Sequence, residues 1–305
     1  MNRPLNLPTA LMLIVPPLLW AGNAIVGRMV HAMVPPITLN FLRWAIAMLI
    51  LLPLAYRIYR PASGLWQNWR RFSVLGLLGI GMYNALQYLA LQSSSPINVT
   101  LVAASMPVWM LLIGRLFFHA KVSGTQVGGA TLSIAGVLLV LSRGTLDQLL
   151  ALRLVPGDLF MILATIAWSL YSWLLTLAKD PVEIRSNWAT FLLAQVTFGT
   201  IWSGAFSAGE WMLSDASIHW SWALVAALAY VAIGPAVIAF RCWGAGVQRV
   251  GPNVAGFFNN LTPLFAAVMS SAFLGELPHL YHGIAFVLIV GGIVLSSRGK
   301  GSVQQ

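Results

Sequence analysis

Long apolar runs separated by short breaks follow one another along almost the whole chain. Each run is close to the ~20 residues that an α-helix needs to cross a hydrocarbon core of ~30 Å. The pattern predicts ten membrane-spanning helices at residues 9–30, 36–58, 71–92, 97–118, 123–142, 157–178, 186–208, 219–243, 252–274 and 279–297. The first run is too long for a signal peptide and is expected to be a permanent helix. We therefore expect an all-α integral membrane protein.

The second half of the chain repeats the breaks of the first. The uncharged stretch Phe72–Gly114 is too long for one helix and is expected to divide at Pro96, because proline cannot continue a helix. A similar junction recurs at Gly251–Pro252. A shift of 156 residues aligns these two prolines, and it also aligns Pro107 with Pro263.

The repeat unit holds five spans, which is an odd number. A second copy must therefore enter the membrane from the opposite side, so the two copies form an inverted repeat. Carriers with inverted repeats bind substrate near the bilayer midplane, between the repeats. We predict a first five-helix repeat over residues 1–150 and a second, inverted one over residues 151–305, around a central cavity.

The composition agrees with a membrane protein. Hydrophobic residues make up 59% of the chain and charged residues only 8%, and the mean hydropathy is +0.82. This leaves too little polar surface to cover a water-soluble globule. The formal net charge of +10 does not indicate nucleic-acid binding, because the basic residues lie at the ends of apolar runs and form no patch with stacking aromatics.

The basic residues also predict the orientation, since Lys and Arg favour cytoplasmic loops. An inside N-terminus places most of the 17 Lys and Arg residues at the inner ends of the spans. They are Arg3, Arg57, Arg60, Arg70, Arg71, Arg115, Lys121, Lys179, Arg185, Arg241, Arg249, Arg298 and Lys300. The outer side holds only Arg28, Arg143 and Arg153. We expect a multi-pass membrane protein with both termini in the cytoplasm.

Residues able to do catalytic or metal chemistry are confined to the ends of the spans or to loops. The seven acidic residues are Asp147, Asp158, Asp180, Glu183, Glu210, Asp215 and Glu276. The five histidines are His31, His119, His219, His279 and His282. They show no metal-ligand or nucleophile–base spacing, so we expect no enzyme, metal site or cofactor. Proton-coupled carriers usually hold ionisable groups inside the membrane, so their absence favours facilitated export or exchange.

Arg43 is the exception, because it lies within the second span. A charge inside a span normally faces a protein-lined or watery space. Arg43 also stands near enough to the outer end of its span for the side chain to reach the interface. Two roles stay open for it, a structural anchor and a contact with a substrate carboxylate.

Aromatic and amide side chains lie near the middle of several spans. Trp20 and Asn23 are three residues apart and share one face of the first helix. A shift of 148 residues aligns them with Trp168 and Tyr171 on the sixth helix. Because polar groups in hydrocarbon need partners, we expect these faces to point into the bundle and to bind substrate.

Three further spans carry residues of the same kind at a similar depth. Tyr83 and Gln87 are four residues apart on the third helix. Trp109 lies in the fourth helix, and Asn259 and Asn260 lie together in the ninth. These five residues complete the predicted substrate-binding set.

Helix-breaking residues stand near these faces. Pro107 and Pro263 are expected to break the fourth and ninth helices, and Gly234–Pro235 the eighth. Pro16–Pro17 precedes Trp20, and Gly79–Gly81 precedes the polar face of the third helix. Interrupted segments at matching places in two repeats point to a binding site, so we predict hinges at Pro107, Pro235 and Pro263.

The fifth span carries Gly124 and Gly128 and the tenth carries Gly291 and Gly292, small residues that permit close helix contact. We assign these spans to packing or to a dimer contact. The expected partners are therefore a small-molecule substrate and the lipid bilayer, with the chain a monomer or a weak homodimer.

These features together resemble the drug/metabolite transporter superfamily, in particular its EamA-type ten-helix carriers. The segments that carry the resemblance are Leu19–Asn23, the Arg43 segment, Pro96–Pro107, Asn260–Pro263, Gly275–Glu276 and Gly283–Gly291. Within this family the chain is most similar to the YddG-type bacterial exporters of aromatic amino acids. The resemblance implies a basket-like bundle around a central cavity and efflux of amino acids and related compounds. One departure is that His119–Lys121 replaces, in the first half, the Gly-Glu pair of the second.

The predicted set favours export of amino acids with aromatic or bulky apolar side chains. Its rings would stack on the side chain, each aromatic pair contributing ~0.5–1.5 kcal/mol beyond burial. Its amides would bind the amino and carboxylate ends. Two alternatives are a broad-specificity metabolite or drug exporter and a membrane-embedded lipid-modifying enzyme, for which only Glu276, His279 and His282 are available.

Overall fold

A computed structural model describes residues 4–94, 96–145, 147, 150, 155–177, 179–274 and 280–298. Every regular element within these ranges is a helix. Nine of the described helical stretches are long and apolar enough to cross a membrane. They are Leu7–Gly27, Pro36–Tyr59, Trp69–Ser93, Asn98–Phe117, Gly124–Leu141, Pro156–Leu174, Trp188–Leu213, Trp222–Val250 and Leu280–Ser297. The all-α membrane class is confirmed, and nine of the ten predicted spans correspond to these stretches.

The first half of the chain folds into a series of helices, two of them short 3-10 turns after α2. They are α1 (Leu7–Val30), α2 (Pro36–Ala55), η1 (Tyr56–Tyr59), η2 (Pro61–Ser63), α3 (Trp69–Gly76), η3 (Leu77–Met82), α4 (Tyr83–Ser93), α5 (Pro96–Ala104), α6 (Met106–Phe117) and α7 (Gly124–Leu141). The third span is one continuous helix in which η3 is a π-helical segment between α3 and α4.

The second half follows the same order. Its helices are α9 (Pro156–Leu174), α10 (Val182–Arg185), α11 (Trp188–Leu213), α12 (Trp222–Val231), η4 (Ala232–Ile238), α13 (Ala239–Val250), α14 (Pro252–Phe258), α15 (Leu261–Leu274) and α16 (Leu280–Ser297). The segment η4 is again π-helical and joins α12 to α13. A shift of 155 residues carries Leu77, where η3 begins, onto Ala232, where η4 begins.

The expected breaks in the fourth and ninth spans are present. Ser105 separates α5 from α6, and Asn259–Asn260 separate α14 from α15. Pro107 and Pro263 each lie in the first turn of the following helix, where a missing N–H costs no hydrogen bond. The ninth span is therefore two shorter helices, and it is not among the nine long stretches of the described residues. Pro16–Pro17, by contrast, lie inside an unbroken α1.

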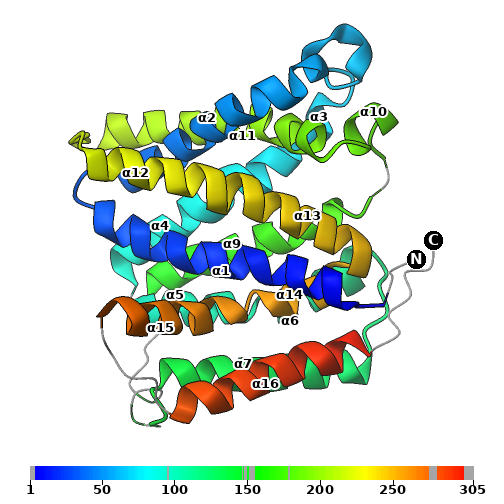
Figure 1. The fold of residues 1–305 in the computed structure, drawn as a ribbon, viewed down its shortest axis with the longest axis vertical. Coiled ribbons are helices and arrows are strands. Elements are labelled where there is room, and N and C mark those ends of the chain that lie inside the picture. Colours follow the sequence, from blue (N-terminus) through cyan, green and yellow to red (C-terminus); the bar gives the residue numbers. More distant parts are fainter. Residues whose placement is uncertain are drawn as a thin grey trace.

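Helices from the two halves pack against one another in a reciprocal pattern (Figure 1). The helix α7 packs along α16, and α2 packs along α11. The helix α4 packs on α9, and in the same way α13 packs on α1. The helices α6 and α14 lie beside these pairs, so α1 and α9 occupy the middle of the bundle.

The pairing of α7 with α16 depends on glycines that let the backbones touch. A Cβ on Gly129 would lie 2.7 Å from the carbonyl oxygen of Gly292, and a Cβ on Gly292 would lie 2.6 Å from that of Gly129. Gly124 has open space around it. The prediction that these helices serve for packing agrees with this contact: Gly292 was predicted to take part, whereas Gly129 is a neighbour of the predicted Gly128.

Each end of the bundle is held by one acidic residue. Asp180 accepts hydrogen bonds from Arg71, at the start of α3, and from Arg185, 2.6 Å away at the end of α10. At the opposite end, Glu210 of α11 accepts from the backbone N–H groups of Ile37 (3.0 Å) and Thr38 (2.7 Å). Glu210 thus caps α2, whose own N-cap is a proline without a capping side chain.

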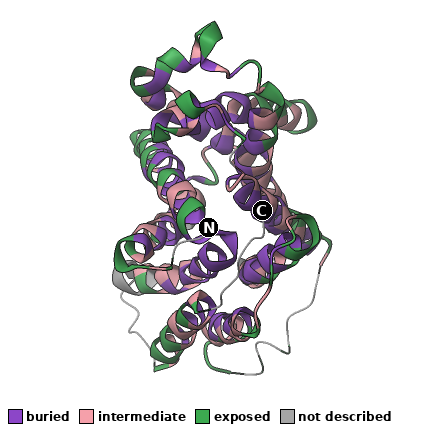
Figure 2. Ribbon diagram, turned by 90° about the vertical axis from the view of Figure 1, so that its right-hand side faces the viewer, coloured by how far each residue is buried: buried purple, intermediate pink, exposed green. Residues whose placement is uncertain are grey.

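Burial follows the expectation for a protein surrounded by lipid. Buried residues face the inside of the bundle, and exposed residues lie on its outer faces and at the helix ends (Figure 2). Large apolar side chains are also exposed on these outer faces, among them Leu49, Phe117 and Val287. Such a surface would be unfavourable in water but suits the hydrocarbon core of a bilayer.

Candidate functional site

The middle of the bundle holds a cluster of aromatic rings from both halves of the chain. We call it the aromatic cluster, and its members are Trp20, Trp44, Tyr83, Trp168, Tyr171, Phe240 and Trp243. Trp168 of α9 is its hub, with ring centroids 5.2 Å from Trp20, 5.2 Å from Tyr83 and 5.1 Å from Tyr171. Four residues of the predicted set are therefore brought together.

The remaining rings come from α2 and α13. Phe240 lies 5.4 Å and Trp243 5.5 Å from Trp168, measured between ring centroids. Trp44 of α2 meets Phe240 edge-on at 4.7 Å. The edge-to-face and tilted geometries are those that aromatic pairs prefer.

The sequence did not indicate Phe240 and Trp243, and the reason lies in a helix boundary. The eighth span was predicted to end at residue 243, where a tryptophan would be read as part of the interfacial belt. The structure continues α13 to Val250, which moves Trp243 two turns into the bundle. Phe240 and Trp243 are three residues apart, as Trp20 and Asn23 are. This spacing could have indicated that the two rings share one helix face.

The two π-helical segments border the aromatic cluster. Each offers a backbone carbonyl to a side chain on another helix: Ile80 accepts from Asn40 and Pro235 accepts from Trp20, both at 3.2 Å. A π segment changes the helical hydrogen-bond pattern, and such segments are frequent at functional sites. Gly79 of η3 lies under the Tyr171 ring, since a Cβ there would come within 2.7 Å of it.

Trp20 and Trp168 occupy matching positions of the repeat but have different surroundings. Trp20 is partly exposed and uses its indole N–H on the Pro235 carbonyl. Trp168 is only 2% exposed, and its indole N–H has no partner among the described residues. The indole N–H of Trp44 is also buried without a described partner. Two indole donors without a described partner inside the bundle are available to a hydrogen-bonding ligand or a water molecule.

Arg43 lies inside the bundle, and the option that its side chain reaches the interface is wrong. The residue is 2% exposed, and its guanidinium lies 5.0 Å from the centroid of the Trp44 ring. One Nη group donates to the side-chain oxygen of Asn23 at 3.5 Å, while Nε has no described partner. Tyr88 of α4 lies close to both Asn23 and Arg43.

Two other predicted residues, Asn259 and Asn260, form the break between α14 and α15, and a third, Trp109, lies one turn after the break between α5 and α6. Asn259 is partly exposed and donates to the Met106 sulfur at 2.8 Å. Asn260 is buried and donates to Ser133 of α7 at 2.9 Å, so it ties the break to the scaffold. Trp109 of α6 donates to Ser105 at 3.0 Å. It belongs to none of the described ring pairs of the aromatic cluster.

The last residue of the predicted set, Gln87, lies one turn beyond Tyr83 on α4 and is partly exposed. Gln195 of α11 was not predicted, yet it accepts the Tyr171 hydroxyl at 2.9 Å. It is buried in a long apolar helix, so a polar residue at mid-span was the signal for it. Of the residues proposed for a lipid enzyme, Glu276 and His279 lie outside the described residues.

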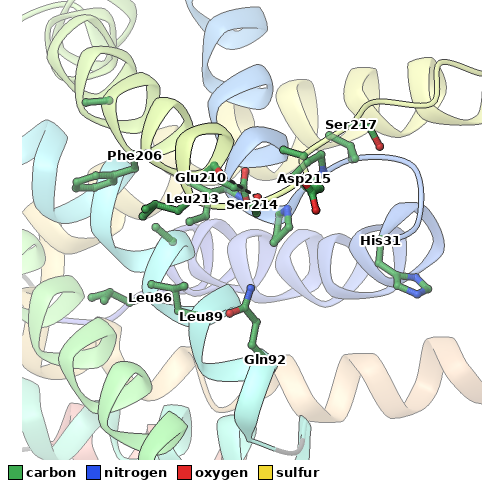
Figure 3. Close-up of a pocket in the computed structure, with 18 of the residues that line it drawn as sticks. His31, Leu86, Leu89, Gln92, Phe206, Glu210, Leu213, Ser214, Asp215 and Ser217 are labelled. Atoms are coloured by element: carbon green, nitrogen blue, oxygen red, sulfur yellow. Dashed lines mark hydrogen bonds between the residues drawn. The ribbon is translucent and has the colours of Figure 1, made fainter.

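A pocket of about 830 Å³ lies away from the aromatic cluster, at the end of the bundle where α1 ends. Figure 3 shows Leu86, Leu89 and Gln92 of α4 facing Glu210 and Leu213 of α11 across it. None of the predicted site residues lines this pocket. It uses a different face of α4 from the one that carries Tyr83.

The comparison with known families identifies the architecture. The model of the EamA-like transporter family matches the chain twice, over residues 7–142 and 155–298. The chain belongs to the EamA-like transporter family. It is therefore a multi-pass membrane transporter, which agrees with its long apolar helices and with the resemblance seen in the sequence.

Relatives of this EamA-like transporter cover most of its length. The aromatic amino acid exporter YddG of Ancylobacter novellus is 26% identical over 281 residues, 92% of this chain and 93% of that protein. An uncharacterized transporter of Archaeoglobus fulgidus is 25% identical over 293 residues, 96% and 98% of the two chains. The uncharacterized inner membrane transporter YedA of Escherichia coli is 24% identical over 233 residues, 75% and 71% of the two chains. A solved crystal structure has the same fold, with a TM-score of 0.75, 22% identity and coverage of 95% and 97%.

Proposed function

We propose that this EamA-like transporter exports amino acids with aromatic or bulky apolar side chains. The observation that carries the proposal is the aromatic cluster, in which rings from α1, α4, α9 and α13 converge at the middle of the bundle. Flat rings at tilted and edge-on angles suit an aromatic side chain. The similarity to an aromatic amino acid exporter supports the same substrate class.

Polar groups beside the cluster give the proposed site its orientation. Asn23, Gln87 and Asn259 are partly exposed within the bundle and can bind the amino and carboxylate groups of an amino acid. The free indole N–H of Trp168 adds a donor among the rings. Asn260 is placed differently, because its amide N–H is already used on Ser133.

The proposed transport cycle is alternating access between two inverted repeats, residues 1–150 and 151–305. Reciprocal packing of α4 on α9 and of α13 on α1 supports this arrangement. The broken helices at Pro107 and Pro263 and the π segment around Pro235 are the proposed hinges, because helical hydrogen bonding is weakest there. The helix α7 packs against α16 of the same chain, so this small-residue contact lies within one molecule. We therefore propose that the transporter works as a monomer or weak homodimer.

The proposed orientation places both termini in the cytoplasm of a bacterial cell, with the chain in the inner membrane. The helix α1 begins and α16 ends at the same end of the bundle (Figure 1). Arg71 and Arg185, which bind Asp180, lie at that end, as the preference of cationic residues for the cytoplasm requires. The relative YedA is an inner membrane transporter by its printed name.

We propose facilitated export or exchange without a buried proton relay. The buried acids Asp158 and Asp180 are held by hydrogen bonds at helix ends: Asp158 binds Ser94 and the Val155 N–H, and Asp180 binds two arginines. Glu210 caps α2. Each of these three carboxylates therefore has a structural task at a helix end.

Purified protein reconstituted in liposomes tests the proposal. Labelled phenylalanine trapped inside is expected to leave, and Trp20→Ala and Trp168→Ala are each expected to reduce this flux at least about tenfold, since truncating an aromatic anchor costs 2 kcal/mol or more. Trp222→Ala is the matched control, because Trp222 is 87% exposed on the outer surface. Unchanged flux in both variants with intact folding would contradict the proposed site.

The same liposomes separate a selective carrier from a broad exporter. An aromatic cavity accepts many flat molecules, so unrelated planar solutes are added as competitors. Strong competition by solutes without an amino acid head group would favour the broad-specificity exporter. Competition limited to amino acids and close analogues would support the proposal.

A further inference from the structure

Arg43 is a buried cation without an acidic partner among the residues that the structure describes. Within the described ranges, both ion pairs involve Asp180, which binds Arg71 and Arg185. Arg43 is 2% exposed, more deeply buried than either of those arginines, yet it contacts no carboxylate. Its nearest polar groups are the neutral side chains of Asn23 and Tyr88. A buried charge is costly unless it is paired and hydrogen-bonded, so a missing anion is indicated.

We infer that Arg43, Asn23 and Tyr88 form a carboxylate-binding subsite, and that the transporter selects its substrates by their carboxylate group. This inference rests on the proposed function, because it assigns one end of the proposed substrate. It goes further by naming the substrate class: organic anions with an apolar or aromatic body, for which the ammonium group is dispensable.

The geometry of the guanidinium suits this role. Its Nε is buried without a partner, and one Nη group makes only a long 3.5 Å contact with Asn23. The Trp44 ring lies 5.0 Å from the guanidinium carbon and holds the guanidinium by a cation–π contact. This contact uses none of the guanidinium N–H groups. Two such groups match the two oxygens of a carboxylate, the pairing that arginine makes best.

The subsite lies next to the aromatic cluster. Asn23 is one turn beyond Trp20 on α1, and Arg43 directly precedes Trp44 on α2. Tyr88 follows Tyr83 by five residues on α4. One helical turn rises ~5.4 Å, which is comparable to the separation of ring and carboxylate in phenylalanine. A substrate can therefore place its side chain among the rings and its carboxylate on Arg43.

Among the described residues, no acidic side chain that could pair with the ammonium group contacts Arg43, Asn23 or Tyr88. Glu210 of α11 binds Ile37 and Thr38 at the start of α2, at least five residues before Arg43. Asn23 and Tyr88 carry no charge, and the subsite contains no acidic side chain among the described residues. The positive charge of Arg43 therefore favours the carboxylate end of a substrate at this subsite.

Ligand binding by the detergent-purified full chain tests the inference with three probes of one shape. They are phenylalanine, 3-phenylpropionate, which lacks the ammonium group, and phenethylamine, which lacks the carboxylate. We expect 3-phenylpropionate to bind within a few-fold of phenylalanine and phenethylamine to bind at least about tenfold more weakly, because it leaves the buried cation unpaired. Equal binding of the amine and the carboxylate would overturn the inference.

Variants then locate the selection. Arg43→Gln is expected to remove the preference for carboxylate over amine, and Arg43→Lys to keep part of it. Arg241→Gln is the matched control, since Arg241 also lies over a tryptophan ring, 4.3 Å from Trp188, but is exposed. A carboxylate preference that persists in Arg43→Gln would contradict the inference.

Asn23→Asp separates binding from folding, in case Arg43→Gln does not fold. It supplies Arg43 with an internal carboxylate, so the protein is expected to keep its thermal stability and to lose binding of 3-phenylpropionate. Wild-type binding in Asn23→Asp would overturn the inference. If phenylalanine does not cross liposomes but Arg43-dependent carboxylate binding remains, the proposed function fails and the subsite stands. If phenylalanine crosses liposomes but binding does not depend on Arg43, the proposed function stands and the subsite fails.

Discussion

The α7–α16 pair and the aromatic cluster use the two halves of the chain in different ways. In the helix pair, Gly129 and Gly292 meet reciprocally, each facing the other's carbonyl oxygen at nearly the same distance. In the cluster, the matched residues Trp20 and Trp168 differ, one partly exposed and bonded to Pro235, the other buried with a free N–H. The scaffold is therefore symmetric, while the proposed site is not.

This difference follows from what each region must do. Two helices that touch along their backbones need the same small residue on both sides, because any side chain would separate them. A single asymmetric substrate needs different contacts at its two ends. The helix α13 contributes two rings, Phe240 and Trp243, whereas its counterpart α4 contributes only Tyr83 to the described ring pairs, and Arg43 has no counterpart in the second half of the described site. The asymmetry is thus expected where cargo binds.

The largest effect is expected from breaking the symmetric contact. Gly129→Val would place its side chain against the backbone of α16, and overpacking of this kind costs about 3 kcal/mol. The midpoint of thermal unfolding in detergent should fall, while any folded fraction keeps its substrate preference. Gly124→Ala is the control, because Gly124 has open space around it. A stable Gly129→Val protein would show that the pair is not a close contact.

A smaller effect is expected at the asymmetric centre. Trp20→Phe keeps an aromatic ring but loses the hydrogen bond to the Pro235 carbonyl, a loss of about 1 kcal/mol. If η4 is a hinge, loss of this bond to Pro235 is expected to make transport faster or substrate binding weaker. The unfolding temperature is expected to change little. Flux and binding are measured on the same preparation. Identical kinetics in wild type and Trp20→Phe would remove this bond from the mechanism.

The smallest effect is expected where the two regions join. Ser133→Ala removes the hydroxyl that accepts the Asn260 amide, and such bonds between membrane helices contribute about 0.6 kcal/mol. Stability should decrease slightly and transport should be retained, since Asn260 serves the scaffold. A large loss of flux without a loss of stability would place Asn260 in the substrate path instead.

Much of the fold could be predicted from local features of the sequence. Apolar length indicated the spans, and Pro107 and Pro263 indicated broken helices because proline has no N–H to donate. Trp20, Tyr83, Trp168 and Tyr171 were predicted to converge, since a polar face in hydrocarbon must turn inward. Gln195 and Asn40 were not recognised, because their roles depend on groups that lie far away in the chain.

The sequence by itself determined that this chain is a multi-pass membrane protein, because apolar length and breaker spacing are local properties. The match to the EamA-like family then identifies it as a transporter. Only the tertiary structure decided which face of each helix meets which. It buried Arg43 beside Trp44, extended α13 so that Trp243 entered the cluster, and formed π segments under Tyr171 and beside Trp20. These outcomes depend on contacts between helices, which no single stretch of sequence specifies.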